Sequence, residues 1–206
     1  KNSGNLLPLS GAVKSIVTVG HNTYVDNAIA GGSGSSLVLP TYTVGPLQGV
    51  TNVLRQLGSG ATVKVLAAPN DGSMDAAIAA AAASADVAIV MAGVVTGEGT
   101  DRTDLSLPKG QDKLIAAVAN RNERTIVVLK DGDPVLMPWV DQVPAILETW
   151  YSGQEDGNVV ARLLFGLANP SGKLPVTYPR LATDTPTSTP DRYPGTSGSD
   201  PVVQYS

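Results

Sequence analysis

Glu98 lies between two glycines in a long polar segment, where a carboxyl group can exchange protons with a bound molecule. The segment, Gly93–Gly110, also holds Asp101, Arg102 and Asp104. Connections of this length without regular structure are uncommon in compact domains and are often functional. A carboxylic acid placed there can act as a general acid or base. The competing interpretation is that Glu98 is solvated and that Asp101 and Arg102 only stabilise the loop.

A second loop, rich in glycine and serine, follows the first apolar run of the chain. It reads IAGGSGSS over residues 29–36, with Gly32, Ser33, Gly34 and Ser35 at its centre. Small residues let the backbone approach a ligand closely. A phosphate-binding loop is disfavoured, because no Lys-Ser/Thr pair follows the glycines and no helix opens directly behind them. A ligand-binding loop and a flexible surface loop remain equally compatible with the sequence.

Other kinds of site fit less well. A calcium site made of Glu98 and its neighbouring aspartates would need about six oxygen ligands, and the EF-hand spacing is missing. The one histidine, His21, cannot form a multi-histidine metal site and is more often structural. The stretch 31–35 has the letters of a nucleophile elbow but leads into no helix. The chain has no cysteine, which excludes disulfides, thiolate metal sites and cysteine nucleophiles. We expect neither metal nor cofactor.

Strand-like and helix-like patterns alternate along the chain and predict the elements that position these loops. Five continuous apolar runs rich in β-branched residues are typical of parallel strands covered on both faces. Helical patterns lie between them, which predicts an α/β fold with a mostly parallel sheet flanked by helices. Ligands bind beyond the carboxyl ends of such strands, where both loops begin. The predicted strands are Ser15–Val19, Val63–Leu66, Val87–Met91, Thr125–Leu129 and Ala145–Trp150. The predicted helices are Pro46–Leu57, Met74–Ser84, Gln111–Asn120 and Asn158–Phe165, and Val176–Tyr178 is expected to form an antiparallel edge strand.

The composition limits the organisation and the partners. The chain of 206 residues suits one α/β domain. We predict a linker over 1–12, the domain over 13–179 and a polar Pro/Ser/Thr-rich tail or strap over 180–206. The net charge of −4 does not favour binding to nucleic acid or to an anionic membrane, which needs a basic surface. No apolar run reaches the roughly 18 residues of a membrane span. The chain begins at Lys1, so we expect a cut or processed product whose targeting signals lie upstream.

Several stretches, in the same order, resemble glycoside hydrolase family 3. GEGTDRTDLSLPKGQDKLIAAV (97–118) is similar to the acid/base segment of that family. KNSGNLLPLS (1–10) resembles its linker into the second domain, and AGGSGSSLVLP (30–40) resembles its glycine-serine loop. Residues 132–179 are similar to the run that ends that domain. The resemblance covers nearly the whole chain and is weak beyond Arg180.

The resemblance implies the second domain of a retaining β-glycosidase, and a β-glucosidase is the preferred activity. Family members usually pair an α/β sandwich with an N-terminal (β/α)8 barrel that carries an aspartate nucleophile. The expected partners are thus a barrel domain or chain and an oligosaccharide or an aryl or alkyl β-glycoside. The protein is expected to be secreted or periplasmic. The chain alone lacks the nucleophile and is expected to be inactive.

The same resemblance assigns roles to residues of the two loops. Glu98 falls on the catalytic acid/base, and a raised pKa is expected for it from partial burial or from the nucleophile nearby. Gly32, Ser33, Gly34 and Ser35 would bind substrate beside the leaving-group subsite. Asp101 and Arg102 match the family pattern as loop supports. The alternative is a non-catalytic α/β module that binds a ligand or a partner at the same strand ends.

Overall fold

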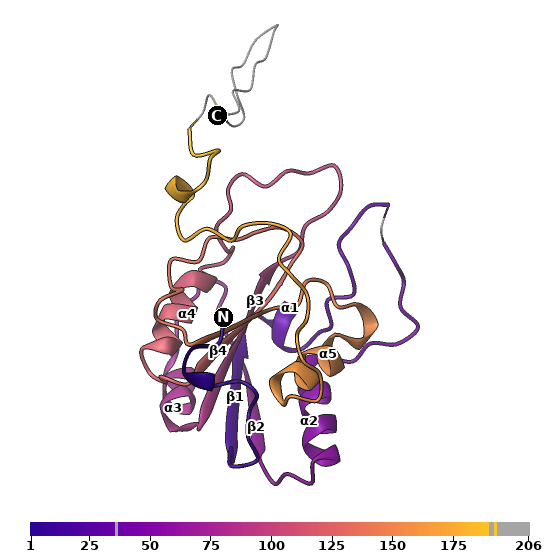
Figure 1. Ribbon diagram of the computed structural model, residues 1–206, viewed down its shortest axis with the longest axis vertical. Helices are drawn as coiled ribbons and strands as arrows, with labels where there is room; N and C mark the ends of the chain where they lie inside the picture. Colours follow the sequence, from indigo (N-terminus) through magenta and orange to yellow (C-terminus); the bar gives the residue numbers. More distant parts are fainter. Residues whose placement is uncertain (36, 190–191, 193–206) are drawn as a thin grey trace, which may run out of the picture.

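A computed structural model describes residues 1–35, 37–189 and 192, and it places a five-stranded parallel sheet between two layers of helices (Figure 1). The strand order is β2-β1-β3-β4-β5, and every pairing is parallel. The five strands are therefore confirmed close to their predicted bounds. They are β1 (Ser15–Gly20), β2 (Thr62–Ala67), β3 (Val87–Val94), β4 (Thr125–Asp131) and β5 (Ala145–Glu148).

The longer helices also lie where the sequence predicts them. Helix α2 starts with Pro46, whose fixed φ suits the first turn of a helix. Helix α3 is capped by Asp75, whose carboxylate accepts from the Ile78 amide. The short α1 is not predicted, because four residues show no helical period. The helices are α1 (Asn22–Val25), α2 (Pro46–Gln56), α3 (Ala76–Ser84), α4 (Gln111–Ala119) and α5 (Asp156–Leu164), with 3-10 turns at Ser3–Asn5, Gly153–Glu155 and Ala182–Asp184.

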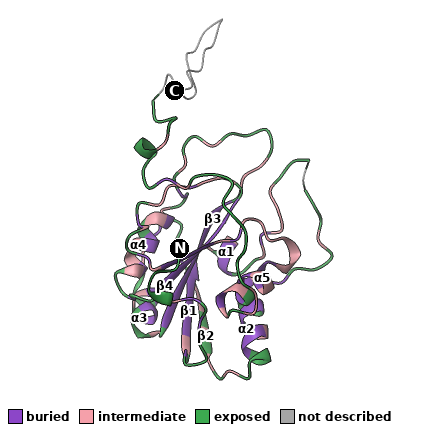
Figure 2. Cartoon of the chain, viewed as in Figure 1, coloured by how far each residue is buried: buried purple, intermediate pink, exposed green. Residues whose placement is uncertain are grey.

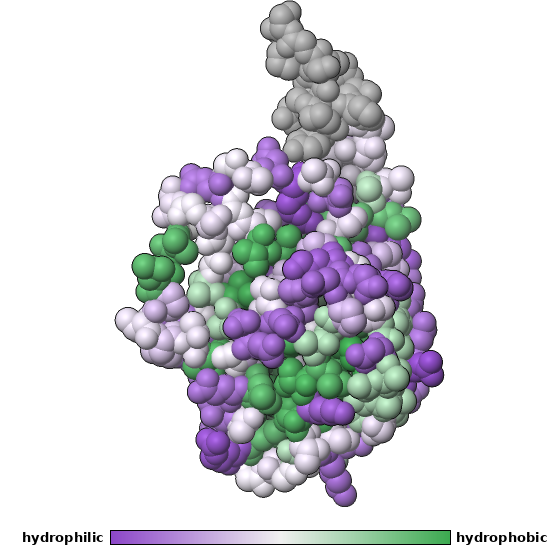
Figure 3. All heavy atoms as spheres, turned by 180° about the vertical axis from the view of Figure 1, so that it is seen from behind, coloured by the Kyte–Doolittle hydropathy of each residue, from purple (hydrophilic) through white to green (hydrophobic). Residues whose placement is uncertain are grey.

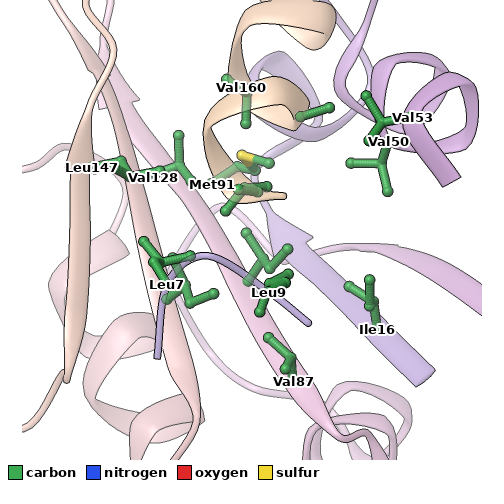
Figure 4. Packing of buried hydrophobic residues seen from close by; sticks show 14 of the residues in the cluster. Leu7, Leu9, Ile16, Val50, Val53, Val87, Met91, Val128, Leu147 and Val160 are labelled. Atoms are coloured by element: carbon green, nitrogen blue, oxygen red, sulfur yellow. The ribbon is translucent and has the colours of Figure 1, made fainter. Parts of the chain in front are cut away.

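Two cores lie on opposite faces of the sheet, and β3 contributes to both. Ile89 and Met91 pack with α2 and α5 (Figure 4), whereas Ala88 and Val90 pack with α3 and α4. Every residue of β3 and β4 is buried (Figure 2). Burial on both faces explains why these strands read as continuous apolar runs, with no polar residue at every second position.

The predicted antiparallel edge strand over Val176–Tyr178 is wrong, because these residues pair with no strand. The outer side of β5 is paired instead by the first residues of the chain. Lys1 exchanges backbone hydrogen bonds with Ile146 at 2.9 and 3.0 Å, and an antiparallel bridge joins Asn2 to Ala145. The sheet edge that a returning strand needs is already occupied.

Strand β5 is also shorter than predicted. Trp150 has a φ of +52°, which is incompatible with a strand. Its amide donates to the Glu148 carboxylate over 2.6 Å. The chain therefore leaves the sheet after Glu148.

The two ends of the chain differ in how much of them the structure describes. In the segment 1–12, Leu7 and Leu9 are buried, and the Leu9 amide donates to the Leu164 carbonyl over 2.7 Å. In the tail, residues 190–191 and 193–206 lie outside the described residues. The boundaries at 12 and 179 stay predictions. None of the described helices is long and apolar enough to cross a membrane.

Candidate active-site loops

The two loops singled out in the sequence meet beyond the carboxyl ends of β1 and β3. The Ser33 amide donates to the Thr96 carbonyl over 3.3 Å, and the Glu98 amide donates to the Ser33 carbonyl over 3.2 Å. A parallel bridge pairs Ser33 with Gly97. The structure thus brings the glycine-serine loop and Glu98 together through backbone hydrogen bonds.

The carboxylate of Glu98 is exposed and is held by the backbone of the glycine-serine loop. Its Oε2 accepts from the Ser35 amide over 2.7 Å. Hydrogen bonding by the side chain and the backbone of Ser35 lowers the pKa of Glu98 below its ordinary value. The raised pKa expected of Glu98 concerns the assembled enzyme and stays a prediction; in this chain alone the hydrogen bonds from Ser35 outweigh the small effect of burial.

Gly34 is required by the way its loop passes Glu98. Its φ is +98°, and a Cβ atom at this position would lie 2.4 Å from the Cβ of Glu98. Only glycine combines this backbone conformation with so close an approach. The sequence GGSGS therefore serves a backbone that folds tightly against a carboxylate.

The predicted loop supports differ from each other. The Arg102 guanidinium donates to the carbonyls of Pro134 and Ser106, each over 3.0 Å, and so links its loop to the segment after β4. Such contacts are compatible with a supporting role for Arg102. The side chain of Asp101 is exposed and has no hydrogen-bonding partner among the described residues. Nearby Asp104 accepts from the Ser106 amide over 2.7 Å and shapes the turn.

Sequence reasoning missed Gln111, which closes the base of the Glu98 loop. Its buried amide group accepts from the Gly93 amide over 3.0 Å and donates to the Gly93 carbonyl over 2.8 Å. The same group donates to the Pro108 carbonyl over 2.9 Å. Gln111 thus ties the beginning of the loop to its end. A glutamine at the first position of an otherwise apolar buried face is the sequence signal that could have indicated it.

A second group of carboxyls lies at the carboxyl ends of β4 and β5. The Tyr178 hydroxyl lies 2.8 Å from Asp131 Oδ1 and 2.9 Å from Glu148 Oε2. Burial, followed by the charge of Asp131, raises the pKa of Glu148 to about 8, and burial raises that of Asp131 to about 6. One tyrosine proton cannot serve two carboxylates, so burial and the charge of Asp131 favour the protonated form of Glu148 in this cluster.

A buried ion pair fixes the start of the glycine-serine loop. Lys130 of β4 and Asp156 of α5 are fully buried, with 2.5 Å between Nζ and Oδ2. The same oxygen accepts from the Ile29 amide over 3.1 Å. A buried pair is stabilising only when its remaining hydrogen bonds are made, and the loop backbone supplies one of them.

His21 takes a structural position. Its Nδ1 accepts from the Thr23 amide over 3.2 Å and so caps α1, and its Nε2 lies 3.0 Å from Lys109 Nζ. Across the described part of the chain, no three His, Asp or Glu side chains gather in a way that could hold a metal ion.

One curated relative aligns over the whole of this chain but is much longer. The model of the glycosyl hydrolase family 3 C-terminal domain matches residues 1–206. Thermostable beta-glucosidase B of Acetivibrio thermocellus is 36% identical over 217 residues, which take in 100% of this chain and 27% of that protein. The chain therefore spans about a quarter of the length of this curated relative.

Solved structures show the same fold. A GH3 beta-glucosidase of Bifidobacterium adolescentis superposes with a TM-score of 0.74 at 30% identity, covering 96% of this chain and 29% of that one. Beta-D-glucoside glucohydrolase of Trichoderma reesei superposes with a TM-score of 0.76 at 26% identity, covering 98% and 30%. Because the family model matches every residue and a relative aligns over the full chain, this protein belongs to glycosyl hydrolase family 3, as a C-terminal domain of that family.

Proposed function

We propose that this chain supplies the general acid/base, Glu98, to the active site of a retaining β-glucosidase that acts on terminal β-linked sugars. One observation carries the proposal: Glu98 is an exposed carboxyl group beyond the carboxyl ends of the strands, and the backbone of the glycine-serine loop holds it by hydrogen bonds. Its position is fixed by the protein, yet its outer side is open to a ligand. The names of the relatives, which are beta-glucosidases, support the reaction class.

The nucleophile lies outside this chain in the proposed enzyme, on a (β/α)8 barrel domain or chain. Retaining enzymes place two carboxyl groups about 5–5.5 Å apart. The barrel aspartate attacks the anomeric carbon while the bond to the leaving oxygen breaks, and that oxygen takes the proton of Glu98. Water then attacks the glycosyl-enzyme, Glu98 accepts the proton of the water, and the aspartate is released. The isolated chain is expected to be inactive.

Docking would also correct the pKa of Glu98. In the chain alone, Ser35 stabilises the ionised form, whereas a general acid must be protonated when substrate binds. A barrel placed over the loops would bury Glu98 and set a negative nucleophile opposite it, and both changes raise the pKa of a carboxyl group. The acid is thus completed by assembly.

An apolar loop beside the site supports the docking. Leu37, Val38 and Leu39 follow the glycine-serine loop and are 58%, 67% and 83% exposed. Figure 3 shows apolar side chains gathered where this loop projects from the domain. Contiguous exposed apolar residues mark sites of interaction, and this group adjoins Gly32–Ser35, which we propose borders the leaving-group subsite. The interdomain linker over 1–12 and a secreted or periplasmic location remain predictions.

The test is Glu98→Gln in the assembled enzyme. General acid–base assistance contributes about 10²–10⁴-fold in rate, so turnover of an alkyl β-glucoside should fall by that factor. The first step with a nitrophenyl β-glucoside should change little, because this group leaves as an anion. The glycosyl-enzyme should then accumulate, and azide should restore turnover as the β-glycosyl azide.

The matched control is Glu123→Gln. Glu123 is exposed and lies between α4 and β4, at the amino ends of the strands, so this change should not alter the turnover of either substrate. Equal losses on both substrates for Glu98→Gln, without azide rescue, would remove Glu98 from the acid/base role. The non-catalytic binding module would then be the better reading.

A further inference from the structure

Tyr151, which follows β5, reaches the base of the loop that carries Glu98. Its hydroxyl donates to the Val94 carbonyl over 2.8 Å and accepts from the Thr96 amide over 2.7 Å. The Thr96 hydroxyl lies 3.1 Å from the same oxygen. One side chain therefore binds the backbone on both sides of Val95, where β3 gives way to the loop.

The position of these contacts explains why a hydroxyl is needed there. The pairing of β3 with β4 ends at Val94 and Asp131, so the next backbone groups have no strand beside them. Partly buried backbone groups without partners destabilise a fold. A phenolic hydroxyl can both donate and accept a hydrogen bond. The Tyr151 hydroxyl thus makes the two hydrogen bonds that a neighbouring strand would otherwise make.

From Thr96 the contacts continue to the proposed acid. The Thr96 carbonyl accepts from Ser33, and the Ser33 carbonyl accepts from the Glu98 amide. The Tyr151 ring also lies beside Gly32, where a Cβ atom would come within 3.4 Å of Cε2 and 2.5 Å of the Thr96 oxygen. Both loops are thus fixed to the sheet through this side chain.

We propose that Tyr151 is a positioning residue that sets the place of Glu98 through Thr96 and Ser33. The inference rests on the proposed function, because it requires Glu98 to be the acid/base. Proton transfer needs heavy atoms within about 2.6–3.2 Å, and a misplacement of about 1 Å can cost up to 10²-fold in rate. Loss of the hydroxyl frees the Thr96 amide and allows the loop to shift, while Glu98 itself keeps its carboxyl group.

The test is Tyr151→Phe in the assembled enzyme, compared with Glu98→Gln. We expect kcat for an alkyl β-glucoside to fall on the order of tenfold, with KM little changed. The glycosylation step with a nitrophenyl β-glucoside should change less than twofold, and azide should partly restore its turnover. Thr125→Val is the matched control, because it removes a buried hydroxyl that bonds to the Asn122 carbonyl at the opposite edge of the sheet. The control should lower thermal stability without any dependence of rate on the leaving group.

Equal losses on both substrates for Tyr151→Phe, alongside a leaving-group effect for Glu98→Gln, would overturn the positioning role and leave the proposed function standing. Unchanged kinetics for Tyr151→Phe would overturn it as well. If Glu98→Gln itself lacks the leaving-group effect, the acid/base assignment fails, and the positioning role fails with it.

Discussion

Two groups of carboxyls lie beyond the carboxyl ends of the strands of one sheet, and they differ in exposure and in the direction in which their pKa values are shifted. Glu98 is exposed, and Ser35 lowers its pKa. Asp131 and Glu148 are largely buried around the Tyr178 hydroxyl, and burial raises the pKa of both. Strongly shifted pKa values often mark functional sites, yet here they belong to a cluster that holds the segment after α5 against β4 and β5. If Glu98 is the acid/base, as we propose, the functional carboxyl is the one that this chain leaves open to solvent.

The largest loss of stability is expected at the buried ion pair below the glycine-serine loop. Lys130→Met leaves Asp156 buried without its cation. Breaking one partner of a buried pair costs about 3–5 kcal/mol. The double variant Lys130→Met/Asp156→Leu should recover most of this loss, although the Ile29 amide then lacks its acceptor. Urea unfolding of the chain, followed by tryptophan fluorescence, measures both. A single variant as stable as wild type would mean that the pair is not buried in solution.

The buried cluster predicts a pH dependence of stability that Glu98 does not share. Because the pKa of Glu148 is raised on folding, the folded state binds more protons between about pH 4.5 and about pH 8. Stability should therefore fall as the pH rises through this window, as the buried carboxyl is forced to ionise. Asp131 should act in the same sense at lower pH, since its pKa is raised to about 6.

Glu148→Gln should remove the part of that dependence that Glu148 contributes, since a neutral amide replaces the protonated carboxyl. We expect variant and wild type to be equally stable near pH 5, with the variant gaining about 1–2 kcal/mol near pH 8 after solvent screening is allowed for. Thermal unfolding at both pH values measures this. A variant that is less stable at pH 8 would show that the ionised carboxylate is the form the fold prefers.

The sequence predicts the strands of the sheet, but it does not predict which segment pairs with the outer strand β5. The strands were predictable because burial on both faces leaves a local mark, as in Val87–Met91. The wrong edge strand over Val176–Tyr178 shows where local pattern fails, since Lys1 and Asn2 compete for the same edge from the other end of the chain. Sheet edges are decided by such long-range competition.

The candidate site divides in the same way. The sequence placed both loops beyond the carboxyl ends of strands, and the structure adds that β1 and β3 are neighbours, which brings Glu98 to the glycine-serine loop. The contacts of Tyr151 did not, because a single aromatic residue in a connection has no periodicity to indicate its partners. The same holds for the pairing of Asp131 with Glu148 through Tyr178, which depends on three segments at once.

A smaller effect on stability is expected from Gly34→Ala, which tests whether the glycine-serine loop holds Glu98 through its backbone. A methyl group cannot be placed 2.4 Å from the Glu98 Cβ, and the φ of +98° disfavours any side chain. The strain is worth about 1–2 kcal/mol, and the loop should relieve part of it by moving, so global stability should fall by less than that. In the assembled enzyme, the loss of activity should exceed the loss of stability. The reverse order would indicate that the loop serves the fold more than the carboxyl group.

The smallest effect separates the two predicted loop supports. Arg102 donates to two backbone carbonyls, and a hydrogen bond to a charged group contributes about 1.5–3 kcal/mol when buried and less when solvent competes. Arg102→Gln should therefore destabilise the chain by about 1 kcal/mol and increase amide hydrogen exchange over 99–106. Asp101 has no such contact in the described part of the chain, so Asp101→Asn should stay within about 0.5 kcal/mol of wild type. Because the two residues are adjacent in one loop, the pair is its own control. If Asp101→Asn proves the more damaging change to this chain, Asp101 makes a stabilising contact in solution, and Arg102 is not the main support of the loop.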